Sequence, residues 1–446
     1  MHGRESQGRR GKAGASDGSE EEQEVASLGT FADDLNEKRK AKRVKALASL
    51  VKAMRGSFDQ TSRELDGLLL TLGSNLKGVL KKAKEGEMEQ ACVVTELAGL
   101  YSDENDGREL LDEVEPVLMA LANPEAVQPG RSEFAVKALS MLYFLCNEDH
   151  EKQQALLKLL EENISGFVPD EVKVAAMRGW GLLATGAPEL KNGTWDTMSE
   201  KARMMIPLLS HDCLDVKVAA GENLALLLEF RHQREDQHIE EKLSDGSSEQ
   251  GEQGIVVENA SDYVTPSKVA ALNSAAHEQA ALAAAASAGA PIEEEEEDWL
   301  GDLVKTLEDL SHDGGNHSKS KRDLKEQRAR FRDILFCVRN GAEPSVKVTI
   351  DKVHVELDTW TDIMRLEATK ELLGDGFLEH VKSNSALYHI LGLSRYGLDA
   401  HLMNDRLINL DERSYYSRTD SKSQQVERSK ARHLRETRKQ AFLTSS

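Results

Sequence analysis

Hydrophobic positions recur along this chain at the spacing of helical repeats. Residues 172–186 read VKVAAMRGWGLLATG and residues 216–230 read VKVAAGENLALLLEF, so two similar segments begin 44 residues apart. In the later copy the apolar residues follow the i, i+3, i+4, i+8 spacing of a helix that buries one face. Stacked repeats of the armadillo and HEAT type recur at about 40 to 47 residues. The pattern therefore predicts a mainly α protein built as an armadillo/HEAT-like helical solenoid.

Three weaker copies precede this pair, which gives about five repeats in all. They begin at Arg43 (RVKALASLVKAM), Gln90 (QACVVTELAGLY) and Glu133 (EFAVKALSMLYFLC). Their spacing varies, as irregular solenoids allow. Gly221 lies in the middle of the last repeat helix, where glycine costs about 1 kcal/mol relative to alanine. We therefore expect a close packing contact at Gly221.

The pattern changes after the repeats. Residues 236–297 contain SDGSSEQGEQG, an alanine-rich run and an acidic block, with few large apolar side chains to anchor them. From Trp299, WLGDLVKTLEDL has the apolar spacing of one docking helix, and from Lys319, KSKRDLKEQRARFRDILFCVRNG predicts a long amphipathic helix. VKVTI and VHVEL alternate apolar and polar residues around Asp351-Lys352, which predicts a short β-hairpin.

These changes divide the chain into six predicted parts. They are a disordered N-terminal tail (1–35), the armadillo-like repeat region (36–235), an acidic and alanine-rich linker or insertion (236–297), a docking helix and loop (298–318), a small, mostly helical C-terminal domain with the hairpin (319–400), and a basic C-terminal tail (401–446).

Composition supports a helical protein inside the cell. Nine prolines and 5% aromatic residues in 446 residues favour helix over sheet. The four cysteines are far apart and form no CxxC pair, which is typical of reduced thiols. No apolar stretch approaches the roughly 18 to 20 residues that a membrane span needs, and the first residues lack the apolar block of a secretory signal. We expect no membrane partner, and a protein of the cytoplasm and nucleus.

The net charge of −21 argues against a general nucleic-acid coat, but basic residues are concentrated in three stretches. The first stretch matches a short nuclear-import pattern, although it could equally be the polar face of the first repeat helix. Its residues are Lys38, Arg39, Lys40, Lys42 and Arg43.

The second and third stretches have the composition of phosphate-binding elements. The second lies on the predicted amphipathic helix, where Lys321, Lys325, Arg328 and Arg332 share one face and Arg322 and Arg330 lie on the same helix. The third lies in the tail and comprises Arg428, Lys430, Arg432, Arg435, Arg438 and Lys439. Basic arms of this kind fold as they bind RNA, and Tyr415 and Tyr416 could stack on bases. The alternatives are a solvated helix face and an unbound solubilising tail.

The sequence contains no recognisable catalytic motif. It lacks a GxxxxGK[ST] loop, a GxSxG elbow and an HExxH helix. His211 and Cys213 form an HxC pair, but two ligands without a second pair rarely hold a metal. We therefore predict no catalytic residue, no metal, no cofactor and no small-molecule substrate.

Four segments carry a resemblance to a known family. AGENLALLLEF, KRDLKEQRARFRDIL, VTIDKVHVELDTW and LGDGFLEHVKSN, in this order, resemble the interferon-related developmental regulator family over Asp34 to Leu393. The resemblance implies an armadillo-like N-terminal region followed by a small conserved C-terminal domain. Animal members of that family are described as transcriptional co-regulators acting with corepressor complexes and as ribosome-binding factors that repress translation. The long insertion between Leu243 and Asp298 departs from the family.

Together these observations predict a non-enzymatic, monomeric regulatory scaffold. The leading hypothesis is a ribosome-associated regulator of translation that binds rRNA through its basic C-terminal region. The alternative is a nuclear transcriptional co-regulator that bridges transcription factors and corepressor complexes. A catalytic protein with an unrecognised site is a third hypothesis.

Overall fold

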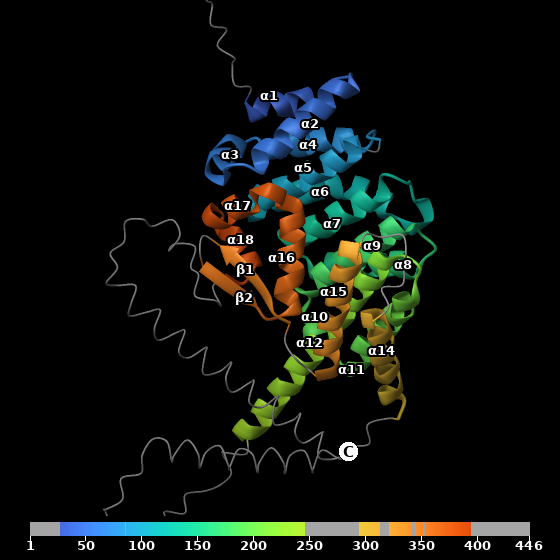
Figure 1. Ribbon diagram of the computed structural model, residues 1–446. Helices are drawn as coiled ribbons and strands as arrows, with labels where there is room; N and C mark the ends of the chain where they lie inside the picture. Colours follow the sequence, from blue (N-terminus) through green and yellow to red (C-terminus); the bar gives the residue numbers. More distant parts are fainter. Residues whose placement is uncertain are drawn as a thin grey trace, which may run out of the picture.

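The computed structural model describes residues 27–84, 86–245, 294–312, 321–340, 344–350 and 353–393. Helices dominate this part of the chain, and its two strands pair into one antiparallel hairpin. Figure 1 shows the helices stacked along one axis, from α1 at one end to α12 at the other. The predicted fold class, an armadillo-like helical solenoid with a short hairpin, is confirmed.

One row of helices runs through the centre of the molecule, and each of its members packs on the next. This inner row consists of α2 (Lys40–Met54), α5 (Glu87–Tyr101), α7 (Ser132–Cys146), α9 (Asp170–Ala184) and α12 (Leu214–Asp245). Each of the five repeat helices expected from the hydrophobic pattern falls within one of them. The spacing of apolar residues therefore identified the inner row.

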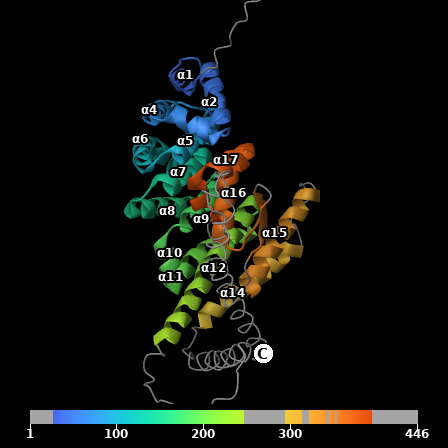
Figure 2. The same cartoon turned by 90° about the vertical axis from the view of Figure 1, so that its left-hand side faces the viewer.

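A second row covers one side of the inner row, as Figure 2 shows. This outer row consists of α4 (Leu69–Leu80), α6 (Glu104–Ala122), α8 (His150–Ser165), α10 (Pro188–Asn192) and α11 (Trp195–Met205). Short 3₁₀ turns follow α6, α11 and α16: η1 (Pro124–Ala126), η2 (Ile206–Ser210) and η3 (Gly374–Gly376). Two further helices, α1 (Leu28–Asp34) and α3 (Phe58–Leu65), complete the N-terminal end.

Buried polar side chains join successive repeats. The Asn163 side-chain amide donates a 2.9 Å hydrogen bond to the Ala122 carbonyl, and Asn223 donates one of 2.9 Å to the Met177 carbonyl. Lys173, in the VKVAA segment, donates to the Ile164 carbonyl at 2.7 Å and so satisfies an orphan carbonyl at the end of α8. These bonds fix how one repeat sits on the next.

The helical region begins before residue 36, so the predicted disordered tail is wrong over residues 27–35. The Ser27 hydroxyl caps α1, and Leu28, Ala32 and Leu35 are buried. The first 35 residues are polar on average, so their composition did not reveal this short apolar stripe, which packs against α2.

The predicted linker is also helical at both of its ends. Helix α12 continues to Asp245, and α14 (Glu294–His312) begins inside the acidic block. Consecutive glutamates suit the first turns of a helix because the N-terminal end of the helix dipole is positive. Residues 246–293, with the alanine-rich run, lie outside the described part of the chain.

The remaining elements form what we call the C-terminal region, α14 to α18. After α14 come α15 (Lys321–Asn340), β1 (Val346–Ile350), β2 (Val353–Leu357), α16 (Trp360–Leu373), α17 (Phe377–Ser383) and α18 (Ser385–Ile390). The predicted hairpin is confirmed, with Val348 opposite Val355.

The C-terminal region shares one hydrophobic core with the repeats. Helix α16 packs on α5, α9 and α12, α15 packs on α12, and α17 packs on α3. The close contact expected at Gly221 is present, because a Cβ there would lie 3.2 Å from Ile334 and 3.8 Å from Phe331, both on α15. The small, mostly helical C-terminal region predicted from the sequence therefore packs directly against the inner row of repeat helices.

Candidate functional site

Arg55, at the end of α2, joins the first repeat to the C-terminal region. Its Nε donates a 2.8 Å hydrogen bond to the Leu372 carbonyl. A Cβ at Gly376 would lie 1.8 Å from the Arg55 carbonyl oxygen, so only glycine fits against this backbone. Gly374 has a φ of +51°, in the region that favours glycine. The LGDGF segment is thus a turn shaped to meet the end of α2.

A buried histidine makes a second link at the same junction. His380, on α17, is fully buried, and its Nε2 lies 2.9 Å from the Met54 carbonyl oxygen. Because a carbonyl oxygen only accepts, Nε2 carries the hydrogen. The rings of Phe58 and Tyr101 each lie 5.7 Å from the His380 ring. Burial lowers the pKa of His380, which favours the neutral ring.

Arg365 ties the middle of α16 to α7 and α9. Its Nε donates to the Thr185 hydroxyl at 3.0 Å, and its Nη2 donates to the Thr185 carbonyl at 2.9 Å. The guanidinium carbon lies 5.6 Å from the centre of the Phe144 ring, a cation–π contact. One turn further, Glu371 pairs with Lys137 at 2.6 Å. Helix α16 is therefore fixed along its length.

Glu229, on α12, caps the first turn of α16. Its carboxylate accepts the backbone N–H groups of Trp360 and Thr361, and the Thr361 hydroxyl at 2.9 Å. Burial raises the pKa of Glu229 to about 7 although these hydrogen bonds favour the ionised form. The local cap, Thr359, accepts only the Asp362 N–H of this first turn. Helix α12 thus supplies the rest of the cap through Glu229.

Two more buried carboxyls lie near the C-terminal region. Burial raises the pKa of Glu96 to about 7, and its Oε2 has no hydrogen-bond partner within the described residues. Burial and the neighbouring Glu367 raise the pKa of Glu222 to about 7, while Arg330 contacts its Oε1 at 2.9 Å. Burial therefore opposes ionisation of Glu96, Glu222 and Glu229.

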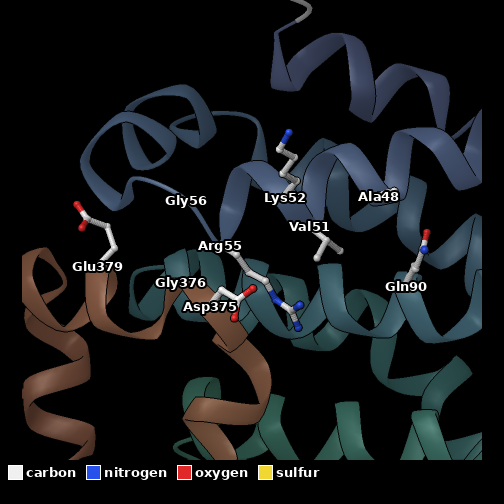
Figure 3. Close-up of a pocket in the computed structure, with 9 residues that line it drawn as sticks. All are labelled: Ala48, Val51, Lys52, Arg55, Gly56, Gln90, Asp375, Gly376 and Glu379. Carbon is white, nitrogen blue, oxygen red and sulfur yellow. The ribbon is translucent and has the colours of Figure 1, made fainter. Parts of the chain in front are cut away.

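The C-terminal region leaves a groove open beside α2, shown in Figure 3. The groove has a volume of about 570 Å³. Its lining residues come from α2 and the turn after it, from α5 and from the LGDGF turn and α17: Ala48, Val51, Lys52, Arg55, Gly56, Gln90, Asp375, Gly376 and Glu379.

The groove combines an apolar wall with charges of both signs. Ala48, Val51, Lys52 and Arg55 follow the i, i+3, i+4, i+7 spacing of one helix face. Asp375 and Glu379 are exposed on the opposite side. The nine lining residues include no cysteine, serine, threonine or histidine.

The predicted basic helix is α15, and the structure divides its cations. The apolar residues Phe331, Ile334 and Val338 are buried in the common core. Arg330 is partly exposed and pairs with Glu222 at 2.9 Å and Glu367 at 3.4 Å. Within the predicted phosphate-binding set, Arg332 is exposed and Arg328 is half-buried, with the Arg332 Nε donating to the Arg328 carbonyl.

The side chains of Lys321, Arg322 and Lys325 lie outside the described side chains, although their backbone forms the first turns of α15. The tail residues lie outside the described residues altogether: Arg428, Lys430, Arg432, Arg435, Arg438 and Lys439. Both parts of the predicted phosphate-binding set stay predictions.

The predicted import stretch spans the turn before α2 and the first turn of that helix. Lys38, Arg39 and Lys40 are exposed, and Lys42 pairs with Glu37 at 3.0 Å. Arg43 has a structural role, because its Nε donates to the buried Glu87 at 2.7 Å. It could contact a receptor only after leaving Glu87.

Sequence reasoning missed the residues that hold the C-terminal region in place. No local sequence motif indicates the long-range contacts of Arg55, Glu229 and Arg365. The two glycines of LGDGF were the available signal, because paired glycines after a helix indicate a tight turn or a close approach.

No helix in the described ranges has the length and apolar character to span a bilayer. The same ranges contain no group of three or more His, Cys, Asp or Glu side chains arranged to hold a metal ion. Cys92, Cys146, Cys213 and Cys337 are free thiols.

The geometry defines an armadillo-like repeat protein whose C-terminal region is built into its inner face. A family model described as interferon-related developmental regulator (IFRD) matches residues 3–339. The chain therefore belongs to the interferon-related developmental regulator family, a family of regulatory proteins.

The relatives cover most of this chain at low identity. Interferon-related developmental regulator 1 of Mus musculus is 22% identical over 381 residues, which are 82% of this chain and 72% of that protein. Interferon-related developmental regulator 2 of Mus musculus is 23% identical over 440 residues, covering 94% and 84%. Among solved structures, a designed armadillo repeat protein matches 51% of this chain and 94% of its own, with a TM-score of 0.32 and 15% identity.

Proposed function

We propose that this protein is a non-enzymatic regulatory scaffold that associates with the ribosome and regulates translation. Its basic C-terminal elements, α15 and the tail at 401–446, contact rRNA phosphates. The groove beside α2 receives a segment of a partner protein. The solenoid holds α15 and the groove at fixed positions.

The observation that carries this proposal is the way α15 is mounted. Phe331 and Ile334 bury one face of the helix, and Arg330 on the same helix pairs with Glu222 of α12. Arg332 remains on the exposed face. Figure 2 shows α15 on the opposite side of the molecule from the outer helices α6 and α8. A rigid basic helix on an otherwise acidic chain suits phosphate contacts that position a protein without reading bases.

The test is sedimentation of the full-length protein with purified ribosomes through a sucrose gradient. We expect the protein in the ribosomal fractions at about 50 mM salt and its release at several times that concentration, because phosphate contacts weaken steeply with salt. Deleting residues 412–446 or changing Lys321, Arg322 and Lys325 to Gln should each reduce the bound fraction. Retention at the top of the low-salt gradient would contradict the proposal.

The second candidate is a nuclear co-regulator, which the exposure of Lys38, Arg39 and Lys40 favours. Replacing these three residues with Ala leaves the Arg43–Glu87 pair intact. Loss of nuclear entry by that variant would support this candidate. Unchanged nuclear entry would remove its support.

A further inference from the structure

A second cationic surface lies at the N-terminal end of the solenoid, away from α15. Residues 38–45 read KRKAKRVK and residues 77–84 read KGVLKKAK, and neither segment contains an acidic residue. The first segment leads into α2, and the second forms the end of α4 and the turn after it. Two basic segments about one repeat apart can lie side by side in a solenoid, because each repeat contacts its neighbours.

Arg43 brings the two segments together. Its Nη1 donates to the Glu37 carbonyl at 2.9 Å and the Lys38 carbonyl at 3.1 Å, and its Nε donates to Glu87 at 2.7 Å. Glu87 begins α5, and the N–H of the next residue donates to the Lys84 carbonyl at 2.8 Å. One guanidinium therefore connects the turn before α2 to the turn after α4.

The cations around this connection remain exposed. Seven of them are exposed and make no ion pair within the described part of the chain: Lys38, Arg39, Lys40, Lys45, Lys81, Lys82 and Lys84. We call these seven residues the basic edge. The nearby acids Glu37 and Glu87 are occupied by Lys42 and Arg43, and Glu89 is an exposed acid in the first turn of α5.

The composition of the basic edge fits phosphates better than a protein partner. Protein interfaces have apolar and aromatic centres and are depleted in lysine. The exposed large hydrophobic side chains that the structure describes are Leu70, Phe167, Phe336 and Leu378, and none belongs to the edge. Six of the seven edge residues are lysines, which contact phosphates as flexible point charges.

We propose that the basic edge binds the phosphate backbone of structured RNA. The choice of RNA rests on the ribosome-associated function proposed above. Because the edge is at the α2 end and α15 contacts α12 at the other end of the inner row, the two surfaces form separate contacts with one large RNA.

The experiment measures binding of the full-length protein to a fluorescent RNA hairpin of about 16 base pairs, the span of one double-stranded RNA-binding module. The test variant changes Lys81, Lys82 and Lys84 to Gln. The matched control changes the exposed residues Lys158, Arg203 and Lys305 to Gln, which alters the net charge by the same amount. A second test variant changes Lys38, Arg39 and Lys40 to Gln on the other segment. Circular dichroism checks that every variant is folded.

We expect each test variant to weaken RNA binding about tenfold or more at about 100 mM salt. The slope of log affinity against log salt should fall by about 2 to 3, since roughly 0.7 to 0.9 counterions are released for each phosphate neutralised. The control should keep the affinity and the slope of the unaltered protein.

Three results would overturn the inference: no RNA binding by the unaltered protein, equal binding by the test variants, or an equal loss in the control. Competition by an oligoglutamate peptide as strong as that by RNA of the same charge would assign the edge to acidic proteins instead. Sedimentation separates this inference from the proposed function. Unchanged hairpin binding by the edge variants, with ribosome association intact, refutes only the edge, whereas RNA binding through the edge without ribosome association refutes only the function.

Discussion

Replacing Gly376 with Ala tests whether the C-terminal region is held against the first repeat as described. Gly376 has a φ of −79°, which alanine adopts without strain. The added Cβ would, however, lie 1.8 Å from the Arg55 carbonyl oxygen and 2.8 Å from its carbonyl carbon. Because these are backbone atoms, no side-chain rotation can relieve the overlap, and α17 must move away from α2.

The cost follows from the contacts that such a movement breaks. The hydrogen bond from Arg55 to the Leu372 carbonyl has a charged donor, which contributes about 1.5 to 3 kcal/mol, and the bond between His380 and the Met54 carbonyl contributes about 0.5 to 1.5 kcal/mol. We expect the Gly376→Ala variant to lose about 2 to 4.5 kcal/mol of unfolding free energy, the sum of these two contributions, which begins within the range of about 1 to 3 kcal/mol typical of overpacked cores and extends above it.

Urea unfolding measures the loss, and Gly78→Ala is its matched control. Gly78 is in the last turn of α4, exposed, with no atom within 4 Å of an added Cβ. Alanine there should stabilise the protein by up to about 1 kcal/mol through helix propensity alone. Hydrogen exchange should also show faster exchange in α17 of the Gly376→Ala variant. A Gly376→Ala protein with an unchanged unfolding midpoint and unchanged exchange would refute the described junction.

Three further predictions concern buried charges. Burial raises the pKa of Glu96 and Glu229 to about 7, so near neutral pH the folded protein binds protons that the unfolded chain releases. The free energy of unfolding should therefore rise as pH falls from about 8 to about 6. In urea unfolding, Glu96→Gln should flatten this pH dependence and raise the free energy of unfolding at about pH 8 by on the order of 2 kcal/mol. Arg43→Ala should lower the melting temperature, whereas Lys40→Ala should leave it within error; equal effects would contradict the structural role of Arg43. Arg365→Ala should cost about 2 to 4 kcal/mol because Thr185 loses both its charged donors, and an unchanged urea midpoint would show that α16 does not depend on that contact.

Hydrophobic periodicity predicted the inner helices because each of them buries a stripe that recurs once per repeat. The stripe of α12, with Val216, Ala220 and Leu224 all buried, is continuous in the sequence and needs no knowledge of its partner. Alternation likewise predicted the hairpin from Val346 to Leu357. Apolar spacing and alternation show which face of a segment is buried, and this is enough to locate the helix or the strand.

The same patterns could not identify what covers each face. Gly221 indicated a close contact, but the sequence around it does not identify the contacting residue, Ile334, which is more than one hundred residues away. Arg330 looked like a member of a phosphate-binding row because its partners, Glu222 and Glu367, come from two distant helices. Contacts between segments so far apart depend on the path of the whole chain, which local spacing does not contain.

The packing of the C-terminal region limits where partners can reach the repeats. Helix α16 packs on α5, α9 and α12, while α2 and Gln90 of α5 line the open groove. The basic edge takes up the first half of the same helix, through Lys40 and Lys45, while the groove and the Arg55 anchor take up the second half. One helix thus connects the phosphate-binding surface, the groove and the anchor.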